Sequence, residues 1–358
     1  MSRFLSKTAR GLEPYVPGEQ LFGEGIVKLN TNEFPYPPPE SVVAAAKNAA
    51  KSLQLYSSTD AKALREKIAE TLPSGLTYEN ISVSNGSDEV LSFIFRAFFE
   101  NGVVFPDITY GFYPVFASYY GISYREIPLD ASLRILPADY CGINENIVLA
   151  NPNAQTGTAL ALSDIEDICA SNPNNIVVID EAYADFRRDG ASAVSLIGKF
   201  PNLIVVRTFS KSMGLAGARL GCAVSSVELI ADIERVRFSF NPYNVNAMTQ
   251  AAGLAALSEL PFYREKCREI IATRAWFSEK LRENGFLLTD SQANFVFCEH
   301  KSVSGEVLQA SLREKGFLVR RFSAPERIKN RLRITIGTPG DMQKLLGAIL
   351  EIIGTKAV

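Results

Sequence analysis

The sequence is poor in the side chains on which several common kinds of active site depend. It has one histidine, His300, and five scattered cysteines that form no CxxC pair. Zinc sites combine several histidines or clustered cysteines, and a disulfide framework needs paired cysteines. A Ser-His-Asp hydrolase could use one histidine, but no GxSxG motif accompanies it. We therefore expect no metal site, no disulfide scaffold and a reducing compartment, the cytoplasm.

Long apolar runs and an excess of positive charge are also missing. No uncharged apolar run reaches the roughly 18 residues that a membrane helix needs, and the first residues lack the apolar core of a signal peptide. The net charge is −2, so composition indicates no nucleic-acid partner. No P-loop motif occurs, and no GxGxxG lies between a strand and a helix. We expect neither a membrane nor a nucleic acid as partner, and no nucleotide site.

The residues that are present describe an α/β protein. With 358 residues, 47% of them apolar, the chain is long enough for two domains. Apolar runs recur at 81–84, 103–105, 147–150, 176–179 and 203–206. The last three begin 29 and 27 residues apart, close to the length of a βαβ unit. Such continuous apolar strands predict a mostly parallel sheet flanked by helices.

After about residue 260 the pattern changes to that of a smaller α+β module. A long charged helix is predicted over 261–284 and another over 304–315, with strands over 294–298, 317–320 and 332–336. We predict an N-terminal arm that also forms part of the small domain, a large α/β domain and a small α+β domain. Their respective ranges are residues 1–40, 41–260 and 261–358.

Polar segments follow the predicted strands where a ligand would bind. The segment 151–157 follows one strand, Asp180 and Tyr183 follow the next, and a segment with Lys211 follows the third. Ligands of open α/β sheets bind beyond the carboxyl ends of the strands. After the strand at 81–84, the residues Asn-Gly-Ser-Asp-Glu open a helix, which makes either an anion site or an ordinary helix cap.

Taken together and in order, these motifs resemble the class II aminotransferases of fold type I, and among them most the histidinol-phosphate aminotransferases. The matching motifs are Asn-Gly-Ser-Asp-Glu at 85–89, Thr-Tyr-Gly at 109–111, Asn-Pro-Asn…Thr-Gly at 151–157, Asp-Glu-Ala-Tyr at 180–183, Ser-Lys…Arg-Leu-Gly at 210–221 and Leu-Arg-Ile-Thr-Ile-Gly at 332–337. Each motif is short, but the ordered set runs collinearly from Pro14 to Thr338.

The resemblance implies a cofactor, a reaction and a set of residues. The cofactor would be pyridoxal 5′-phosphate, and the reaction would move an amino group between L-histidinol phosphate and 2-oxoglutarate in histidine biosynthesis. Lys211 resembles the Schiff-base lysine, Asp180 the partner of the ring nitrogen, and Tyr183 the phenol that hydrogen-bonds the ring oxygen O3′. The other cofactor-binding residues implied are Gly86, Ser87, Asp88, Tyr110, Asn153, Ser210, Arg219 and Tyr56. Tyr56 would come from a partner subunit, which implies a homodimer.

Substrate contacts are implied for four residues, Tyr15, Asn32, Arg320 and Arg333. In the predicted strand 332–336, alternation places Arg333 and Thr335 on one face. Two other reactions fit the same fold, those of an aromatic amino acid aminotransferase and of a threonine-phosphate decarboxylase. A binding protein without activity is a third class, which the intact set of lysine, aspartate, tyrosine and arginine opposes.

The sequence departs from the family pattern at one position. Family members usually carry an asparagine where this chain has Ala154, and its amide binds O3′. Two explanations stay open: Asn153 substitutes from the neighbouring position, or Tyr183 carries this interaction alone.

Overall fold

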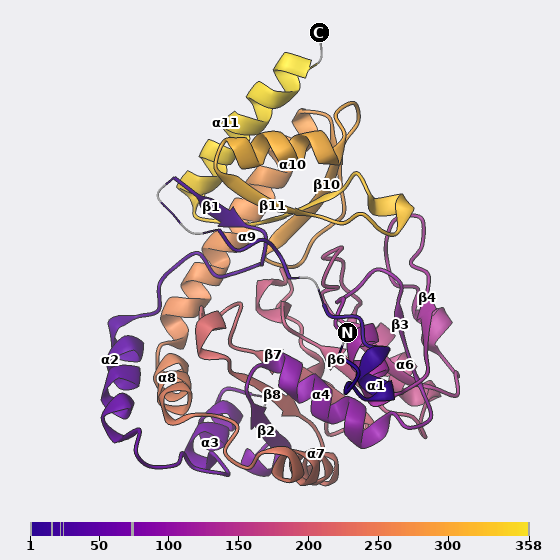
Figure 1. The fold of residues 1–358 in the computed structure, drawn as a ribbon, viewed down its shortest axis with the longest axis vertical. Helices are drawn as coiled ribbons and strands as arrows, with labels where there is room; N and C mark the ends of the chain where they lie inside the picture. Colours follow the sequence, from indigo (N-terminus) through magenta and orange to yellow (C-terminus); the bar gives the residue numbers. More distant parts are fainter. Residues whose placement is uncertain (1, 16, 22, 24, 73–74, 357–358) are drawn as a thin grey trace.

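The computed structural model describes residues 2–15, 17–21, 23, 25–72 and 75–356. Its strands form two sheets, one of seven strands and one of five. Figure 1 shows the larger sheet in the lower part of the molecule and the smaller sheet in the upper part, with α9 (Leu260–Glu283) running between them. We call these parts the large body and the small body.

The large body contains the mostly parallel sheet that the apolar runs predicted. Its strand order is β2-β8-β7-β6-β5-β3-β4, and only β8 runs antiparallel to its neighbours. The strands are β2 (Ile81–Ser84), β3 (Val103–Pro106), β4 (Tyr124–Ile127), β5 (Asn146–Ala150), β6 (Val177–Asp180), β7 (Leu203–Thr208) and β8 (Gly221–Val224). Since β5, β6 and β7 are buried nearly throughout, each of them is a continuous apolar run.

Helices that alternate with these strands cover the sheet. They are α2 (Glu40–Ala49), α3 (Lys62–Glu70), α4 (Ser87–Phe98), α5 (Tyr113–Tyr120), α6 (Leu162–Ser171), α7 (Val227–Phe240) and α8 (Ala247–Ser258). A further short helix, α1 (Lys7–Arg10), lies near the N-terminus. Helix α4 follows β2 after two residues and buries Val90, Leu91 and Phe93. This packing fixes the start of α4 at the carboxyl end of β2.

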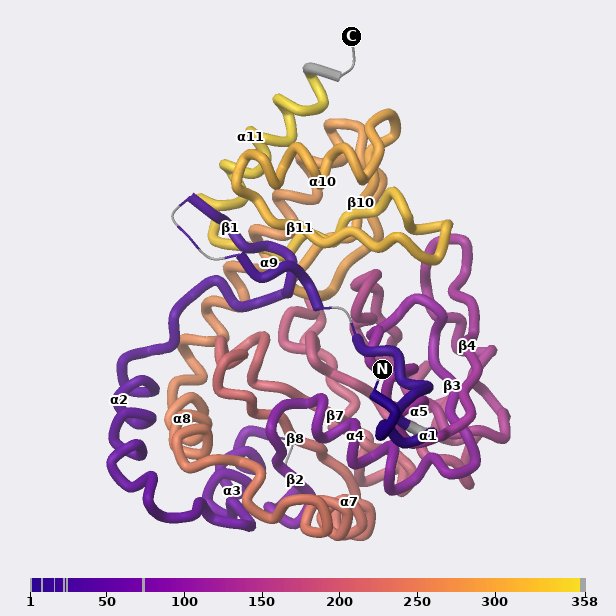
Figure 2. Tube along the Cα trace, in the orientation of Figure 1, coloured from indigo at the N-terminus to yellow at the C-terminus, as the bar shows by residue number. Residues whose placement is uncertain are grey.

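The small body joins the two ends of the chain. Its sheet has the order β1-β11-β12-β10-β9, and the helices α10 (Gly305–Glu314) and α11 (Pro339–Lys356) accompany it. The strands are β1 (Val27–Leu29), β9 (Phe286–Leu288), β10 (Phe295–His300), β11 (Phe317–Arg321) and β12 (Leu332–Thr335). Figure 2 shows the indigo N-terminal segment passing through β1 in the small body before it returns to α2. The predicted domain boundaries at 40/41 and 260/261 stay a prediction.

All five cysteines are free thiols. In the ranges that the structure describes, none of the helices is both long enough and apolar enough to span a bilayer.

Candidate active site

A cavity of about 350 Å³ collects residues from all the motifs that follow the strands of the large body. The residues that line it are Thr31, Glu33, Ser87, Asp88, Tyr110, Ala154, Asp180, Ala182, Tyr183, Thr208, Ser210, Lys211, Ala216, Gly217 and Arg219. Most of them follow β2, β5, β6 or β7, as expected for ligands beyond the carboxyl ends of strands. Thr31 and Glu33 come instead from the N-terminal segment that leaves the small body.

Lys211 is placed in this cavity by the loop that follows β7. Its Nζ donates a hydrogen bond to the carbonyl oxygen of Thr31, at 3.1 Å. Burial, and then the nearby Arg333, lower the pKa of Lys211 to about 8. About a tenth of the population is therefore a neutral amine at pH 7, far more than for an ordinary lysine, and the neutral amine is the form that attacks a carbonyl carbon.

Asp180 ends β6 and is only 5% exposed. The hydroxyl of Tyr113 donates to its Oδ2 at 2.9 Å, and the backbone N–H of Ala182 donates to its Oδ1 at 3.1 Å. Burial raises the pKa of Asp180 to about 6 despite these bonds. A buried carboxylate of this kind is stabilised by a cationic partner, such as a protonated ring nitrogen. Tyr113 was not predicted, because it stands among many aromatic residues.

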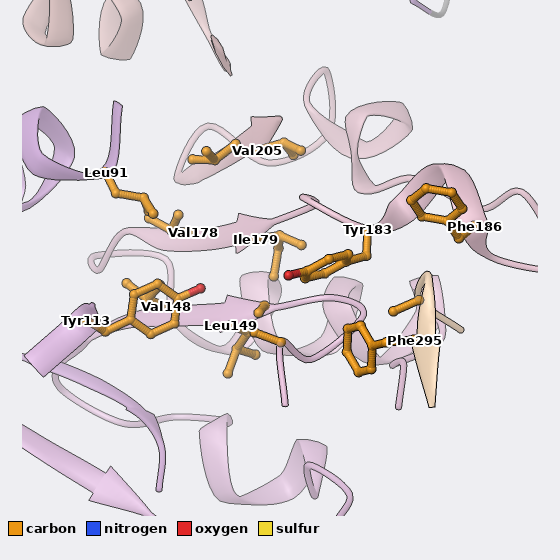
Figure 3. Close-up of a cluster of buried hydrophobic side chains, with 14 of the residues drawn as sticks. Leu91, Tyr113, Val148, Leu149, Val178, Ile179, Tyr183, Phe186, Val205 and Phe295 are labelled. Carbon is orange, nitrogen blue, oxygen red and sulfur yellow. The ribbon is translucent and has the colours of Figure 1, made fainter. Parts of the chain in front are cut away.

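Tyr183 follows Asp180 by three residues in the sequence, and contacts hold its ring and its hydroxyl group. Its ring packs edge to face against Phe295, with the ring centroids 5.3 Å apart, and Figure 3 shows it beside Ile179 and Phe295. Its hydroxyl oxygen accepts a hydrogen bond from Nδ2 of Asn32 at 2.9 Å. Burial raises the pKa of Tyr183, so the phenol keeps its proton and can donate it in a hydrogen bond.

The start of α4 offers hydrogen-bond donors to an anion. The first N–H groups of a helix have no partner within the helix, and they favour a bound anion. Close packing leaves room only for glycine here: a Cβ on Gly86 would lie 2.6 Å from Nη2 of Arg219, and one on Gly221 would lie 2.4 Å from the backbone nitrogen of Ser87. Arg219 therefore lies against the helix start, and Ser210 lines the same cavity. These donors fit the phosphate of pyridoxal 5′-phosphate.

Tyr110 completes the wall between the anion site and the ring pocket. Its hydroxyl donates to Oδ1 of Asp88 at 2.7 Å, while Oδ2 of Asp88 lies 3.3 Å from Nη2 of Arg219. Burial raises the pKa of Tyr110 well above its ordinary value. The residues present thus fit both ends of the cofactor, with Asp180 and Tyr183 at the ring and α4 at the phosphate.

The structure does not bring Asn153 to the cavity, contrary to the cofactor contact predicted for it. Asn153 is fully buried, and its amide is used within the turn. Its Oδ1 accepts from Thr109, and its Nδ2 donates to the carbonyl of Ile108 and to Thr156. Ala154 lines the cavity instead. The amide that contacts Tyr183 belongs to Asn32, which lies 151 residues before Tyr183 in the chain.

Arg320 and Arg333 are paired residues of the neighbouring strands β11 and β12. The guanidinium carbons of both lie over the ring of Phe322, at 5.4 and 5.5 Å from its centroid. Arg333 donates to Oε1 of Gln155 at 3.1 Å and to the carbonyl of Asn30 at 3.2 Å. Its Nε is buried without a hydrogen-bond partner in the described part of the chain. A buried donor without a partner is uncommon in folded proteins.

The remaining predicted residues lie at the edge of the site or outside it. The ring of Tyr15 lies 4.6 Å from that of Phe112, close to Tyr110. Tyr56 is 83% exposed and stacks on Tyr243, with ring centroids 4.4 Å apart. Tyr56 therefore lies outside the cavity of its own chain.

Fold and site together define an enzyme of the aminotransferase type, and comparison with known proteins agrees. The model of the family "Aminotransferase class I and II" matches residues 24–349, and the chain belongs to this family. It is 44% identical over 355 residues to histidinol-phosphate aminotransferase 1 of Oceanobacillus iheyensis, covering 99% of each chain. It is 46% identical over 355 residues to histidinol-phosphate aminotransferase 1 of Bradyrhizobium diazoefficiens, covering 99% of this chain and 100% of that protein.

A solved structure shares the fold over the same length. It is that of histidinol-phosphate aminotransferase from Sinorhizobium meliloti in complex with pyridoxal-5′-phosphate. It matches with a TM-score of 0.87, covers 99% of each chain and is 24% identical in sequence. The predictions of the family and of the fold class are confirmed.

Proposed function

We propose that the protein transfers an amino group between L-histidinol phosphate and 2-oxoglutarate in histidine biosynthesis, with pyridoxal 5′-phosphate held at Lys211. The observation that carries this proposal is the cavity that joins Lys211, Asp180 and Tyr183 to an anion site at a helix start. The two relatives that are 44% and 46% identical, both named histidinol-phosphate aminotransferase, support the choice of substrate.

The residues of this chain divide the work of the reaction. When bound, the cofactor supplies an electron sink for bond breaking at the donor's α-carbon. Asp180 keeps the ring nitrogen protonated, because its buried carboxylate is stabilised by that charge. Lys211 would take the proton from the α-carbon and deliver it to C4′ of the cofactor, which suits an amine whose pKa is about 8. Tyr183 donates a hydrogen bond to the ring oxygen, and Tyr110 covers the ring.

The two arginines of the small body suit a site that must hold different anions in turn. Histidinol phosphate carries a phosphate but no carboxylate, whereas glutamate carries two carboxylates. Among the described residues none is a hydrogen-bond partner of the buried Nε of Arg333, and Arg320 lies beside it over the same ring. Guanidinium groups bind both carboxylate and phosphate oxygens in bidentate fashion. We assign the substrate's anionic groups to Arg320 and Arg333, with Tyr15 closing the edge.

A panel of amino donors with 2-oxoglutarate tests the substrate. We expect histidinol phosphate to react with a far higher specificity constant than phenylalanine or tyrosine. Charge-assisted hydrogen bonds contribute about 1.5–3 kcal/mol each. Arg320→Ala should therefore lower the specificity constant for histidinol phosphate about ten- to a hundredfold, with a smaller loss for unphosphorylated donors. Arg333→Ala should damage both half-reactions. An equal loss for all donors in Arg320→Ala would favour the aromatic aminotransferase reaction instead.

The active unit that we propose is a homodimer in the cytoplasm. Exposed apolar side chains gather in two segments that touch through the stacked rings of Tyr56 and Tyr243. These side chains are Leu53, Leu55, Tyr56, Phe240 and Tyr243, which are 60%, 66%, 83%, 69% and 41% exposed. A patch of this kind marks a protein contact. In this assembly Tyr56 reaches the cofactor phosphate of the partner subunit.

A further inference from the structure

Family members usually have an asparagine amide at the position of Ala154, and in this chain a buried amide of the N-terminal segment, that of Asn32, contacts Tyr183 instead. Ala154 lines the cavity without a polar side chain, and the amide of Asn153 is used by Thr109, Ile108 and Thr156. Neither residue can donate a hydrogen bond toward the cofactor ring. Asn32, by contrast, is 1% exposed and has its Nδ2 at 2.9 Å from the hydroxyl oxygen of Tyr183.

Asn32 is held in place from three directions. Its backbone has φ 57°, in the left-handed region that asparagine and glycine adopt most readily. Its backbone N–H donates to Oγ1 of Thr335, and that hydroxyl donates to Oδ1 of Asn32, both at 3.0 Å. Nδ2 of Asn294 donates to its carbonyl oxygen, also at 3.0 Å. With Oδ1 engaged by Thr335, the amide turns its N–H₂ toward Tyr183.

We propose that Asn32 is a positioning residue for Tyr183, so that a chain of donors from Asn32 through Tyr183 to the cofactor's ring oxygen replaces the amide missing at Ala154. The inference rests on the proposed function, since it needs the cofactor at Lys211. A phenol oxygen that accepts one hydrogen bond points its own proton elsewhere, and here that proton is left for the cavity. Accepting a bond also makes the phenol a stronger donor, because hydrogen bonds in a chain polarise one another.

This role differs from the substrate contact that family resemblance gives Asn32. Thr335 and Tyr183 together use both ends of its amide. A residue that acts through Tyr183 changes the electronic state of the cofactor before any substrate arrives. A substrate contact changes KM and leaves the resting state unaltered. The visible absorption of the cofactor linked to Lys211 changes with pH, and the pH at half of this change, called the midpoint below, distinguishes the two roles.

The test uses the full-length holoenzyme and two variants of Asn32. Asn32→Gly removes the amide and keeps the left-handed backbone free of strain. Asn32→Asp keeps the shape but offers an acceptor in place of the donor. A donor to the ring oxygen stabilises its negative charge and lowers the midpoint. A whole hydrogen bond is worth about one pH unit. Asn32→Gly leaves the donor bond of Tyr183 in place and weakens it by lost polarisation, so it should raise the midpoint by a fraction of one unit. Asn32→Asp accepts the proton of Tyr183 and withdraws it from the ring oxygen, so it should raise the midpoint by roughly one unit. We expect kcat to fall while KM for the donor stays near that of the wild type.

Three further variants connect the effect to Tyr183. Asn172→Ala is the matched control, because Asn172 is a buried asparagine whose amide binds the carbonyls of Tyr140 and Ile168 away from the cavity; its midpoint should equal that of the wild type. Ala154→Asn, added to Asn32→Gly, should move the midpoint back by restoring an amide at the family position. In a Tyr183→Phe background, Asn32→Gly should cause no additional shift.

The outcomes separate this inference from the proposed function. If Lys211 carries the cofactor and Asn32→Gly and Asn32→Asp both leave the midpoint unchanged, this inference is wrong and the proposed function stands. A full shift in the Tyr183→Phe background would also overturn it, because Asn32 would then act without Tyr183. If wild-type protein forms no linkage at Lys211, both proposals fail together.

Discussion

Lys211 is a single amine whose surroundings disfavour its charge. Burial and Arg333 lower its pKa to about 8, and the neutral form is the nucleophile. As pH rises through about 8, the neutral fraction grows, so capture of pyridoxal 5′-phosphate by cofactor-free protein should accelerate and then level off. Stopped-flow absorbance across pH measures this rate. A rate that keeps rising to the ordinary pKa of lysine would contradict the lowered pKa.

We also predict that Lys211 is the residue that binds the cofactor covalently. Borohydride reduction of the holoenzyme followed by peptide mapping should label Lys211 alone, and Lys211→Ala should lose both the label and turnover. Lys211→Arg serves as a control that keeps a positive charge in the cavity. A label on any other lysine would show that the assignment is wrong.

For Asp180 we predict that a substitution lowers turnover much more than it lowers cofactor affinity. Asp180→Asn keeps the shape of the side chain and its contacts with Tyr113 and Ala182, so fold and much of the cofactor affinity should persist. Because the carboxylate acts chiefly on the charge that develops during reaction, turnover should fall by several orders of magnitude. Tyr113→Phe, which removes one hydrogen bond to Asp180, should lose only about tenfold. Near-normal turnover in Asp180→Asn would mean that Asp180 is structural.

At the scale of secondary structure elements, the contact between β8 and the start of α4 is the tightest part of the anion site. Gly221 pairs with Ser84 of β2 and Thr208 of β7, so it cannot shift away from Ser87. In Gly221→Ala the new Cβ should lower the free energy of unfolding by about 1–3 kcal/mol and weaken cofactor binding. Gly198→Ala is the control, since a Cβ there meets nothing within 4 Å. Thermal unfolding and cofactor titration measure both effects.

Strands were predictable from the sequence where burial on both faces produced a continuous apolar run, as in β5, β6 and β7. The long charged helix α9 was predictable for another reason, because its buried residues recur at helical spacing. Strand β4 was missed because three of its four residues are exposed, which leaves no apolar pattern. Strand β8 was missed because Gly221 and its neighbours look like the end of a glycine-rich loop.

The site could be predicted as far as it depends on one body and its motifs. Lys211, Asp180, Tyr183 and Arg219 follow strands of one sheet, and they meet as expected. Asn32 was assigned to the substrate, and Asn153 to the cofactor, from family resemblance alone. The contact of Asn32 joins the two bodies and leaves no periodic signal in the sequence, and the amide of Asn153 is used within its own turn. The contact between Asn32 and Tyr183 depends on how β1 and β12 lie against the end of β6.

At the scale of the whole molecule, the exposed position of Tyr56 predicts a site shared between subunits. Tyr56→Ala and Lys211→Ala should each be nearly inactive alone. Mixing them under conditions of subunit exchange should restore part of the activity, because one site of each hybrid dimer then has both residues intact. Light scattering measures the assembly, and Tyr56→Ala mixed with itself is the control. No recovery despite proven exchange would contradict a shared site.

Three consecutive residues leaving β1 each contact a different functional group. The carbonyl of Asn30 binds Arg333, the carbonyl of Thr31 binds Lys211, and the amide of Asn32 binds Tyr183. Inserting or deleting one residue between Leu29 and Asn32 would displace all three contacts at once, whereas a substitution would alter one. Selection should therefore remove insertions and deletions from this short segment, even where single side chains are substituted. Mutant libraries built to alter the enzyme should vary the amino acids of this segment and keep its length fixed.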